Sequence, residues 1–235
     1  MGRTIACVFV LAVLLSACKS STDSNTDPLS GVTWKSLTLG SSLTYLVEEL
    51  DSTDNLVAGK AFQLTMVVDS VGLAEWGRTN VIRIRQDDPQ PIFISYDENG
   101  DLLILNTTTT NGVVTDFSWE RLPVKSRIAN TPPTTDSTYP NGNVSKTQVT
   151  DTFDGSENIT TAGKSFGCAR VISTYVGSTD YPSGGQSKYV TTTTSWYAPE
   201  LGFFVEYREK DLSYSDGTIT SSKGWLWRLT SYHIQ

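Results

Sequence analysis

Apolar and polar residues alternate from Val32 to the last residues of the chain, and this alternation restricts the fold more than any other feature. Between Val81 and Arg85, for example, Ile82 and Ile84 are separated by an arginine. Successive side chains of a strand point to opposite faces, so a period of two describes strands with one buried and one solvated face. No stretch places apolar residues at helical spacing. The sequence therefore predicts an all-β domain built on an antiparallel sheet.

Turn residues divide the alternating region into strands. The pair Asn99-Gly100 between residues 92–96 and 102–105 predicts a hairpin, because these residues readily adopt the positive φ angles of a tight turn. Asn111-Gly112 and Ser215-Asp216-Gly217 predict two more hairpins. In the second half of the chain we expect strands over residues 165–175, 188–197, 203–212 and 218–230.

The region 123–145 interrupts the pattern. It contains Pro132-Pro133, Tyr139-Pro140 and Asn141-Gly142-Asn143, and clusters of proline and glycine do not sustain a hydrogen-bonded ladder. We expect a long loop or a linker here. Residues 32–235 are predicted to form one domain, with a division into two domains at this region as the alternative.

The first eighteen residues have the pattern of an export signal. Arg3 precedes an apolar run from Val8 to Leu15, which is too short to span a bilayer and fits a signal peptide. The four residues Leu15-Ser16-Ala17-Cys18 resemble the lipobox of bacterial lipoproteins. The resemblance implies cleavage before Cys18 and a diacylglycerol on its sulfur, with acyl chains such as palmitate. A plain secretory peptide with an unmodified Cys18 is the alternative.

Residues 18–31 are predicted to be a flexible tether after removal of the signal peptide at residues 1–17. The segment is rich in Ser, Thr, Asp and Asn, which form no core. The residue after the lipidated cysteine is Lys19 and not aspartate. By analogy with the sorting of known lipoproteins, this favours the outer membrane of the cell envelope.

Charge and cysteine content limit the partners of the chain. The net charge of −7 becomes −8 when Arg3 leaves with the signal peptide, and the pI is about 4.7. An acidic surface argues against nucleic acid, so membrane contact is predicted to depend on the covalent anchor. Cys168 is the one cysteine left beside Cys18. We therefore expect no intramolecular disulfide and a small, buried thiol.

No catalytic constellation is recognisable in the sequence. Ala162-Gly163-Lys164-Ser165 lacks the upstream glycine of a phosphate-binding loop, and His233, the only histidine, supports neither a triad nor a multi-histidine metal site. Asp151, Asp154 and Glu157 could supply oxygen ligands to Ca²⁺, but their spacing departs from the EF-hand pattern and a tight Asp-Gly turn alone explains them. We predict no catalytic residues, no metal and no cofactor.

The aromatic content, with six tryptophans and ten tyrosines, allows two interpretations. In the first, the rings pack in the core and across strands. In the second, they line an apolar or sugar-stacking cavity inside a curved sheet. The candidate ligand-binding residues of the second interpretation are Trp119, Trp196, Phe203, Trp225 and Trp227.

Three stretches share motifs with a known family. Leu37–Tyr45 is similar to Pro-Leu-x-x-Gly-x-x-Trp-x-Tyr, Thr161–Cys168 to Pro-Ala-Gly-x-Phe-x-Cys, and Ser195–Phe204 to Trp-Tyr-Ala-Pro-Gly-Val-Gly-Leu-Val, with Glu200 at the first of its two motif glycines. On these motifs the chain resembles the TapB-like lipoproteins of the bacterial cell envelope. The resemblance implies a strongly curved antiparallel sheet or an open half-barrel, and it brings no catalytic residues.

These observations together predict a lipid-anchored envelope module that is not an enzyme and that binds an apolar ligand or an envelope partner. Two alternatives stay open. One is an envelope hydrolase that cleaves polysaccharide with paired carboxylates, whose separation only the fold can set. The other is a structural subunit of a surface assembly, which requires an exposed apolar patch.

Overall fold

The computed structural model describes residues 27–87, 90–110 and 113–235, so the signal peptide and Cys18 lie outside the described residues. The described chain is all β, as predicted, and contains twelve strands in a single domain. They are β1 (Ser42–Leu50), β2 (Leu56–Glu75), β3 (Arg78–Arg85), β4 (Ile92–Tyr96), β5 (Leu102–Thr110), β6 (Val113–Leu122), β7 (Thr135–Thr138), β8 (Val144–Thr161), β9 (Lys164–Asp180), β10 (Gln186–Ala198), β11 (Phe203–Ser215) and β12 (Thr218–His233).

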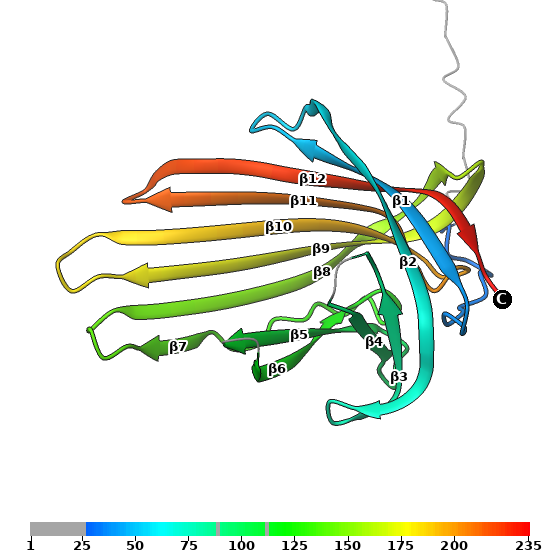
Figure 1. The fold of residues 1–235 in the computed structure, drawn as a ribbon, viewed down its shortest axis with the longest axis horizontal. Coiled ribbons are helices and arrows are strands. Elements are labelled where there is room, and N and C mark those ends of the chain that lie inside the picture. The colour runs from blue at the N-terminus through cyan, green and yellow to red at the C-terminus, as the bar shows by residue number, and fades with distance from the viewer. Residues whose placement is uncertain (1–26, 88–89, 111–112) are drawn as a thin grey trace, which may run out of the picture.

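All twelve strands form one antiparallel sheet in the order β6-β5-β4-β3-β2-β1-β12-β11-β10-β9-β8-β7. Strands that follow each other in the chain pair with each other, except β6 and β7, which form the two edges of the sheet, and β1 pairs with β12 in its middle. The sheet curls so that its first half crosses the long strands β8 to β12 (Figure 1). It is not closed, because the edge strands β6 and β7 do not pair with each other. The predicted curved sheet or open half-barrel is confirmed.

Several predicted hairpins are found in the structure. β4 and β5 pair across residues 97–101, where Gly100 has a φ of 82° and its N–H donates to the Asp97 carbonyl. β11 and β12 pair across Asp216-Gly217, both with positive φ. β5 and β6 also pair, although their turn at residues 111–112 lies outside the described residues.

The predicted turn at Asp154-Gly155 is wrong. β8 continues through this region and pairs with β9 from residue 144 to residue 161. The register shifts between Phe153 and Ser156, and Gly155 has a φ of 113°. The extra residues are therefore a β-bulge, in which glycine adopts a backbone conformation that other residues avoid. A bulge and a turn share the same residue preferences, so the sequence alone did not distinguish them.

Two other boundaries also differ from the sequence analysis. The region 123–145 is a loop only up to Thr134, because β7 and the start of β8 form a hairpin within it. The predicted tether 18–31 ends earlier, since Leu29 is buried in the core. Asp27 accepts hydrogen bonds from Ser156 and Arg127, which hold its carboxyl pKa at about 2, with the Ser156 bond as the largest cause.

The core lies on the face of the sheet where β1 and β2 cross the long strands. Alternate residues of β1, namely Leu43, Tyr45 and Val47, are buried there, and each such side chain contributes about 2 kcal/mol of hydrophobic stabilisation. The Tyr45 hydroxyl donates to the Phe204 carbonyl at 2.7 Å, and burial raises its pKa. Further core residues are Leu64, Met66, Val68, Ile82, Ile84, Ile94, Val171, Tyr197 and Leu229.

A buried carboxylate fixes the chain after β6. Asp101 has no solvent exposure, and its oxygens accept hydrogen bonds from the backbone N–H groups of Lys125 and Ser126, each at 2.8 Å. The Ser126 hydroxyl and the Arg121 guanidinium also donate to it. Four donors on one carboxylate explain how a segment without a ladder keeps a defined path.

We expect Asp101→Ala to lower the free energy of unfolding by about 3 kcal/mol, because it removes the acceptor of two backbone N–H groups, of the Ser126 hydroxyl and of Nη1 of Arg121. Urea unfolding followed by tryptophan fluorescence measures the change. Asp136→Asn, on the exposed strand β7, is the control and should shift stability by no more than about 0.5 kcal/mol. Equal stability of Asp101→Ala and the wild type would contradict this assignment.

Candidate functional site

Two of the predicted ligand-binding residues, Trp225 and Trp227, lie two positions apart on β12 and therefore share a face of the strand. The Trp227 ring contacts Tyr45 and Tyr207, with centroids 6.3 and 5.4 Å apart. The Trp225 ring meets Phe62 edge-on at 6.3 Å. These cross-strand contacts fit the packing interpretation of the aromatic content.

The other three predicted residues have different surroundings. The Trp119 indole donates to the Trp76 carbonyl at 3.0 Å. The Trp196 indole donates to the Glu157 carboxylate at 2.8 Å. Phe203 is buried in the core. None of the five residues lines either of the two pockets described below.

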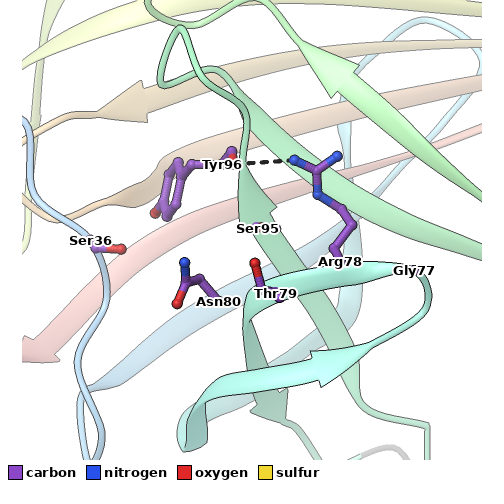
Figure 2. A pocket seen from close by; sticks show the side chains of 7 residues that line it. All are labelled: Ser36, Gly77, Arg78, Thr79, Asn80, Ser95 and Tyr96. Carbon is purple, nitrogen blue, oxygen red and sulfur yellow. Dashed lines mark hydrogen bonds between the residues drawn. The ribbon is translucent and has the colours of Figure 1, made fainter.

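The larger pocket has a volume of about 530 Å³ and lies between β3, β4 and the segment that precedes β1 (Figure 2). Every lining residue except glycine carries a hydroxyl, amide or guanidinium group, and none is acidic. The residues are Ser36, Gly77, Arg78, Thr79, Asn80, Ser95 and Tyr96. A concave site of this size with convergent polar groups is typical of small-molecule binding.

The smaller pocket, of about 170 Å³, adjoins the larger one, because Ser36 and Tyr96 line both. We refer to them together as the paired pockets. The remaining lining residues of the smaller pocket are Trp34, Lys35, Gly100, Lys125 and Tyr197. Trp34 stacks on Tyr197 at 6.0 Å, and the Lys125 ammonium lies 5.8 Å from the Trp34 ring centroid. The smaller pocket thus has aromatic and cationic walls.

Gly202 allows the segment that contains Ser36, a residue of both pockets, to pack closely against the turn before β11. Gly202 has a φ of 74°, and a Cβ atom there would lie 2.8 Å from the Lys35 carbonyl oxygen. The Gly202 carbonyl accepts a hydrogen bond from the Tyr96 hydroxyl at 3.0 Å, and the Lys35 N–H donates to the Pro199 carbonyl. The segment before β1 can therefore approach the turn between β10 and β11 this closely only because residue 202 has no side chain.

Arg78 is the charged residue of the larger pocket. Its Nη2 donates a long hydrogen bond of 3.4 Å to the Tyr96 carbonyl, and its guanidinium lies 5.9 Å from the Trp119 ring centroid. Its Nε is buried and has no hydrogen-bond partner among the described residues. The turn before it, Trp76-Gly77, has positive φ at both residues, a conformation that is costly for tryptophan.

A pair of carboxyl groups lies where the two sheet edges approach each other. Glu120 of β6 hydrogen-bonds to Asp151 of β8, which is fully buried. Asn106 donates to Glu120, and Asn130 donates to Asp151 at 2.9 Å. Oδ1 of Asp151 is buried and receives no hydrogen bond from any ordinary donor among the described residues. Because a carboxylate has no donor of its own, Glu120 and Asp151 can hydrogen-bond to each other only when one of them is protonated.

The titration of this pair follows from its surroundings. Burial raises the pKa of Glu120 to about 7, and the charge of Asp151 adds to the increase. Burial also raises the pKa of Asp151, while hydrogen bonds from Ser173 and Asn130 oppose the increase. We therefore assign one proton to the pair near neutral pH, held by Glu120.

The candidate calcium ligands do not converge. Arg170 forms ion pairs with Asp154 and Glu157, at 2.9 and 2.8 Å, whereas Asp151 faces Glu120. The described residues contain no group of three or more acidic, histidine or cysteine side chains that could hold a metal. Cys168 is fully buried, and burial raises its pKa to about 12, so the thiol is not a nucleophile.

Sequence reasoning identified neither site, although it named Asp151 in another role, as a candidate calcium ligand. Arg78 and Asn80 stand in an ordinary alternating run, and the one signal near them is Gly77. Glu120 lies on the edge strand β6 and Asp151 on β8, the second strand from the other edge, so no local spacing connects them. Both sites depend on contacts between distant segments.

Comparison of the chain with protein families gives no match, and comparison with curated proteins gives none either. Two solved structures are similar. One is a candidate lipoprotein from Parabacteroides distasonis, 17% identical, with a TM-score of 0.42 over 86% of this chain and 99% of that one. The other is a candidate exported protein with a YmcC-like fold from Bacteroides fragilis, 13% identical, with the same TM-score and the same coverage. Within the part of the chain that the structure describes, no helix is long and apolar enough to cross a membrane.

We expect Glu120→Gln to change how stability depends on pH. The raised pKa means that the folded state holds a proton that the unfolded chain releases near pH 4.5. This stabilisation is complete below that pH and is lost as the pH rises through about 7. Glutamine keeps an uncharged donor at every pH, so the variant should be more stable than the wild type at pH 8 and similar to it at pH 4.5.

Chemical denaturation at a series of pH values measures this difference. Glu98→Gln, at an exposed turn position, is the matched control and should follow the wild type throughout. If the curves of Glu120→Gln and the wild type run parallel from pH 4.5 to pH 8, Glu120 does not hold the proton.

Proposed function

We propose that this protein is a lipid-anchored module of the bacterial cell envelope that binds a polar ligand in the paired pockets and catalyses no reaction. The observation that carries the binding role is the larger pocket, whose volume is about 530 Å³ and whose lining is polar. Ligand pockets in proteins commonly enclose several hundred cubic ångströms and use a few placed polar groups for orientation.

The anchoring role rests on the lipobox-like sequence that ends at Cys18. Fixation of Asp27 to Ser156 and Arg127 leaves a tether from Cys18 to Asp27, which reaches about 30 Å when fully extended. The module would thus work close to a bilayer, and the outer membrane is the location that Lys19 favours. An acidic chain at the membrane surface needs a covalent anchor, and nucleic acid is not a partner we expect.

The pocket lining favours a polar ligand over the apolar ligand that the aromatic content predicted. Trp225 and Trp227 are engaged with other rings, whereas Ser36, Thr79 and Asn80 are exposed at the larger pocket. Exposed hydroxyl and amide groups in a hollow orient a ligand that itself has donors and acceptors.

The hydrolase alternative receives less support from the geometry. Glu120 and Asp151 are the paired carboxyl groups of the fold, but they hydrogen-bond directly and Asp151 has no solvent exposure. Glycosidases hold their two carboxyl groups about 5–10 Å apart, with the sugar bond between them. A half-buried Glu120 in direct contact with a fully buried Asp151 joins β6 to β8 and leaves no gap between the two carboxyl groups for a sugar bond.

Lipidation at Cys18 is tested by growing cells with an alkyne analogue of palmitate. The wild type should be labelled and should fractionate with the outer membrane, and Cys18→Ser should lose both properties. Cys168→Ser should keep the label, because Cys168 lies in the core. A labelled Cys18→Ser variant or an unlabelled wild type would rule out the anchor.

Ligand binding is tested by native mass spectrometry of the full-length lipidated protein extracted from its own membrane. The wild type should retain a non-covalent small molecule, and Ser36→Trp should lose it, because Ser36 lines both pockets. Thr33→Trp, exposed on the same segment but outside the lining, should keep it. An empty wild type, or equal retention in Ser36→Trp, contradicts the binding role.

A further inference from the structure

Arg78 differs from the other half-buried arginines of the described chain. Each of the other four lies within 4.0 Å of a carboxylate: Arg83 of Asp69, Arg121 of Asp101, Arg170 of Asp154 and Glu157, and Arg228 of Glu48. Arg78 has no carboxylate partner among the described residues, and its Nε is buried without a hydrogen bond. A partly buried charge normally has a partner, so the Arg78 guanidinium lacks an anion.

The lining of the paired pockets is positively charged, whereas the protein as a whole is negatively charged. The chain carries a net charge of −7, yet the paired pockets contain Arg78, Lys35 and Lys125 and no aspartate or glutamate. Local cations in a hollow attract anions even when the overall field repels them, because a Debye length of about 10 Å limits the reach of distant charges.

The residue two positions before Arg78 has a strained backbone conformation. Trp76 has a φ of 55° in the turn immediately before it. The Trp76 ring packs against Phe93 and Phe117, and its Nε1 is a second buried donor that finds no hydrogen-bond partner in the described part of the chain. Backbone strain of this kind persists where surrounding contacts enforce it, and it concentrates at binding sites. The strained turn thus lies directly before the arginine that lines the larger pocket.

Neutral groups around Arg78 complete the site. Figure 2 shows Asn80 and Ser36 facing the space beside the Tyr96 ring, with Arg78 on the opposite side of Thr79. These side chains offer both donors and acceptors. A ligand that occupies the larger pocket would therefore meet a cation at one end and hydroxyl and amide groups at the other.

We infer that the ligand of the paired pockets is an anion, a small polar molecule that carries a carboxylate or phosphate group which binds Arg78. This inference rests on the proposed function, since it names the chemistry of the ligand in the same pockets. The remaining hydroxyl groups of such a molecule bond to Asn80, Thr79 and Ser36, and Lys35 and Lys125 attract its charge on entry.

Three related probes test the inference by isothermal titration calorimetry on the full-length lipidated protein in detergent. Glucuronate carries a carboxylate, glucose 6-phosphate carries a phosphate, and glucose carries neither. At least one of the two anions should bind about tenfold or more tightly than glucose, as expected for charge-assisted hydrogen bonds. Added NaCl should weaken that binding. The relative affinities of the two anions show which group Arg78 prefers.

Arg78→Gln should weaken binding of the preferred anion about tenfold and leave glucose unaffected. Arg85→Gln is the matched control, because Arg85 is an exposed arginine on the same strand and outside both pockets. Circular dichroism checks that both variants are folded, and Arg78→Lys should restore part of the affinity. Equal loss in Arg85→Gln would overturn the assignment to Arg78.

The experiments distinguish failure of this inference alone from failure of the proposed binding role. If glucose binds as tightly as both anions, and Ser36→Trp but not Arg78→Gln abolishes that binding, the pockets bind neutral ligands and the inference fails alone. If none of the three probes binds and the protein extracted from its membrane retains no small molecule, the inference and the binding role fail together.

Discussion

Backbone hydrogen bonds between β1 and β12 join the two halves of the sheet. They pair residues 42–50 with residues 224–233, which lie at opposite ends of the described chain. Without this ladder, β1 to β6 and β7 to β12 would be two separate meanders, each with an additional open edge. The same junction buries Tyr45 and Val47 beside Leu229. The core and the curvature of the sheet therefore depend on a long-range pairing, which forms slowly in most folds.

Among the described residues the two edges of the sheet are joined by no such ladder, and side chains and one backbone bridge hold them together. β6 and β7 remain unpaired edges, and the chain between them is fixed by the carboxylates of Asp101 and Asp151 and by the bridge between Asn130 and Asp151. A protonated Glu120 adds one more hydrogen bond there. Proteins commonly protect sheet edges with charged or irregular segments, and here burial raises the pKa of both Glu120 and Asp151 where the two edges approach each other.

The sequence predicted much of the fold because strands and turns have local signatures. Alternation at Ile82 and Ile84 and the turn at Asn99-Gly100 depend on neighbouring residues alone. β8 was missed because its polar, threonine-rich stretch resembles a loop and because Gly155 fits a turn as well as a bulge. The sites were missed for a different reason. Arg78 stands out because it has no carboxylate partner within the described ranges, which only the three-dimensional structure reveals.

The strand order also has a consequence for how such a fold can be encoded. Read from one edge to the other, the sheet runs from β7 to β12 and then from β1 to β6. Gln235 touches the segment before β1, where its carbonyl accepts a hydrogen bond from Thr38. A variant in which Gln235 is linked to the segment before β1, and whose new ends lie between β6 and β7, would have the same sheet. Its strands would follow one another in an up-and-down series. Every ladder would then form between successive strands, so the architecture is compatible with circular permutation.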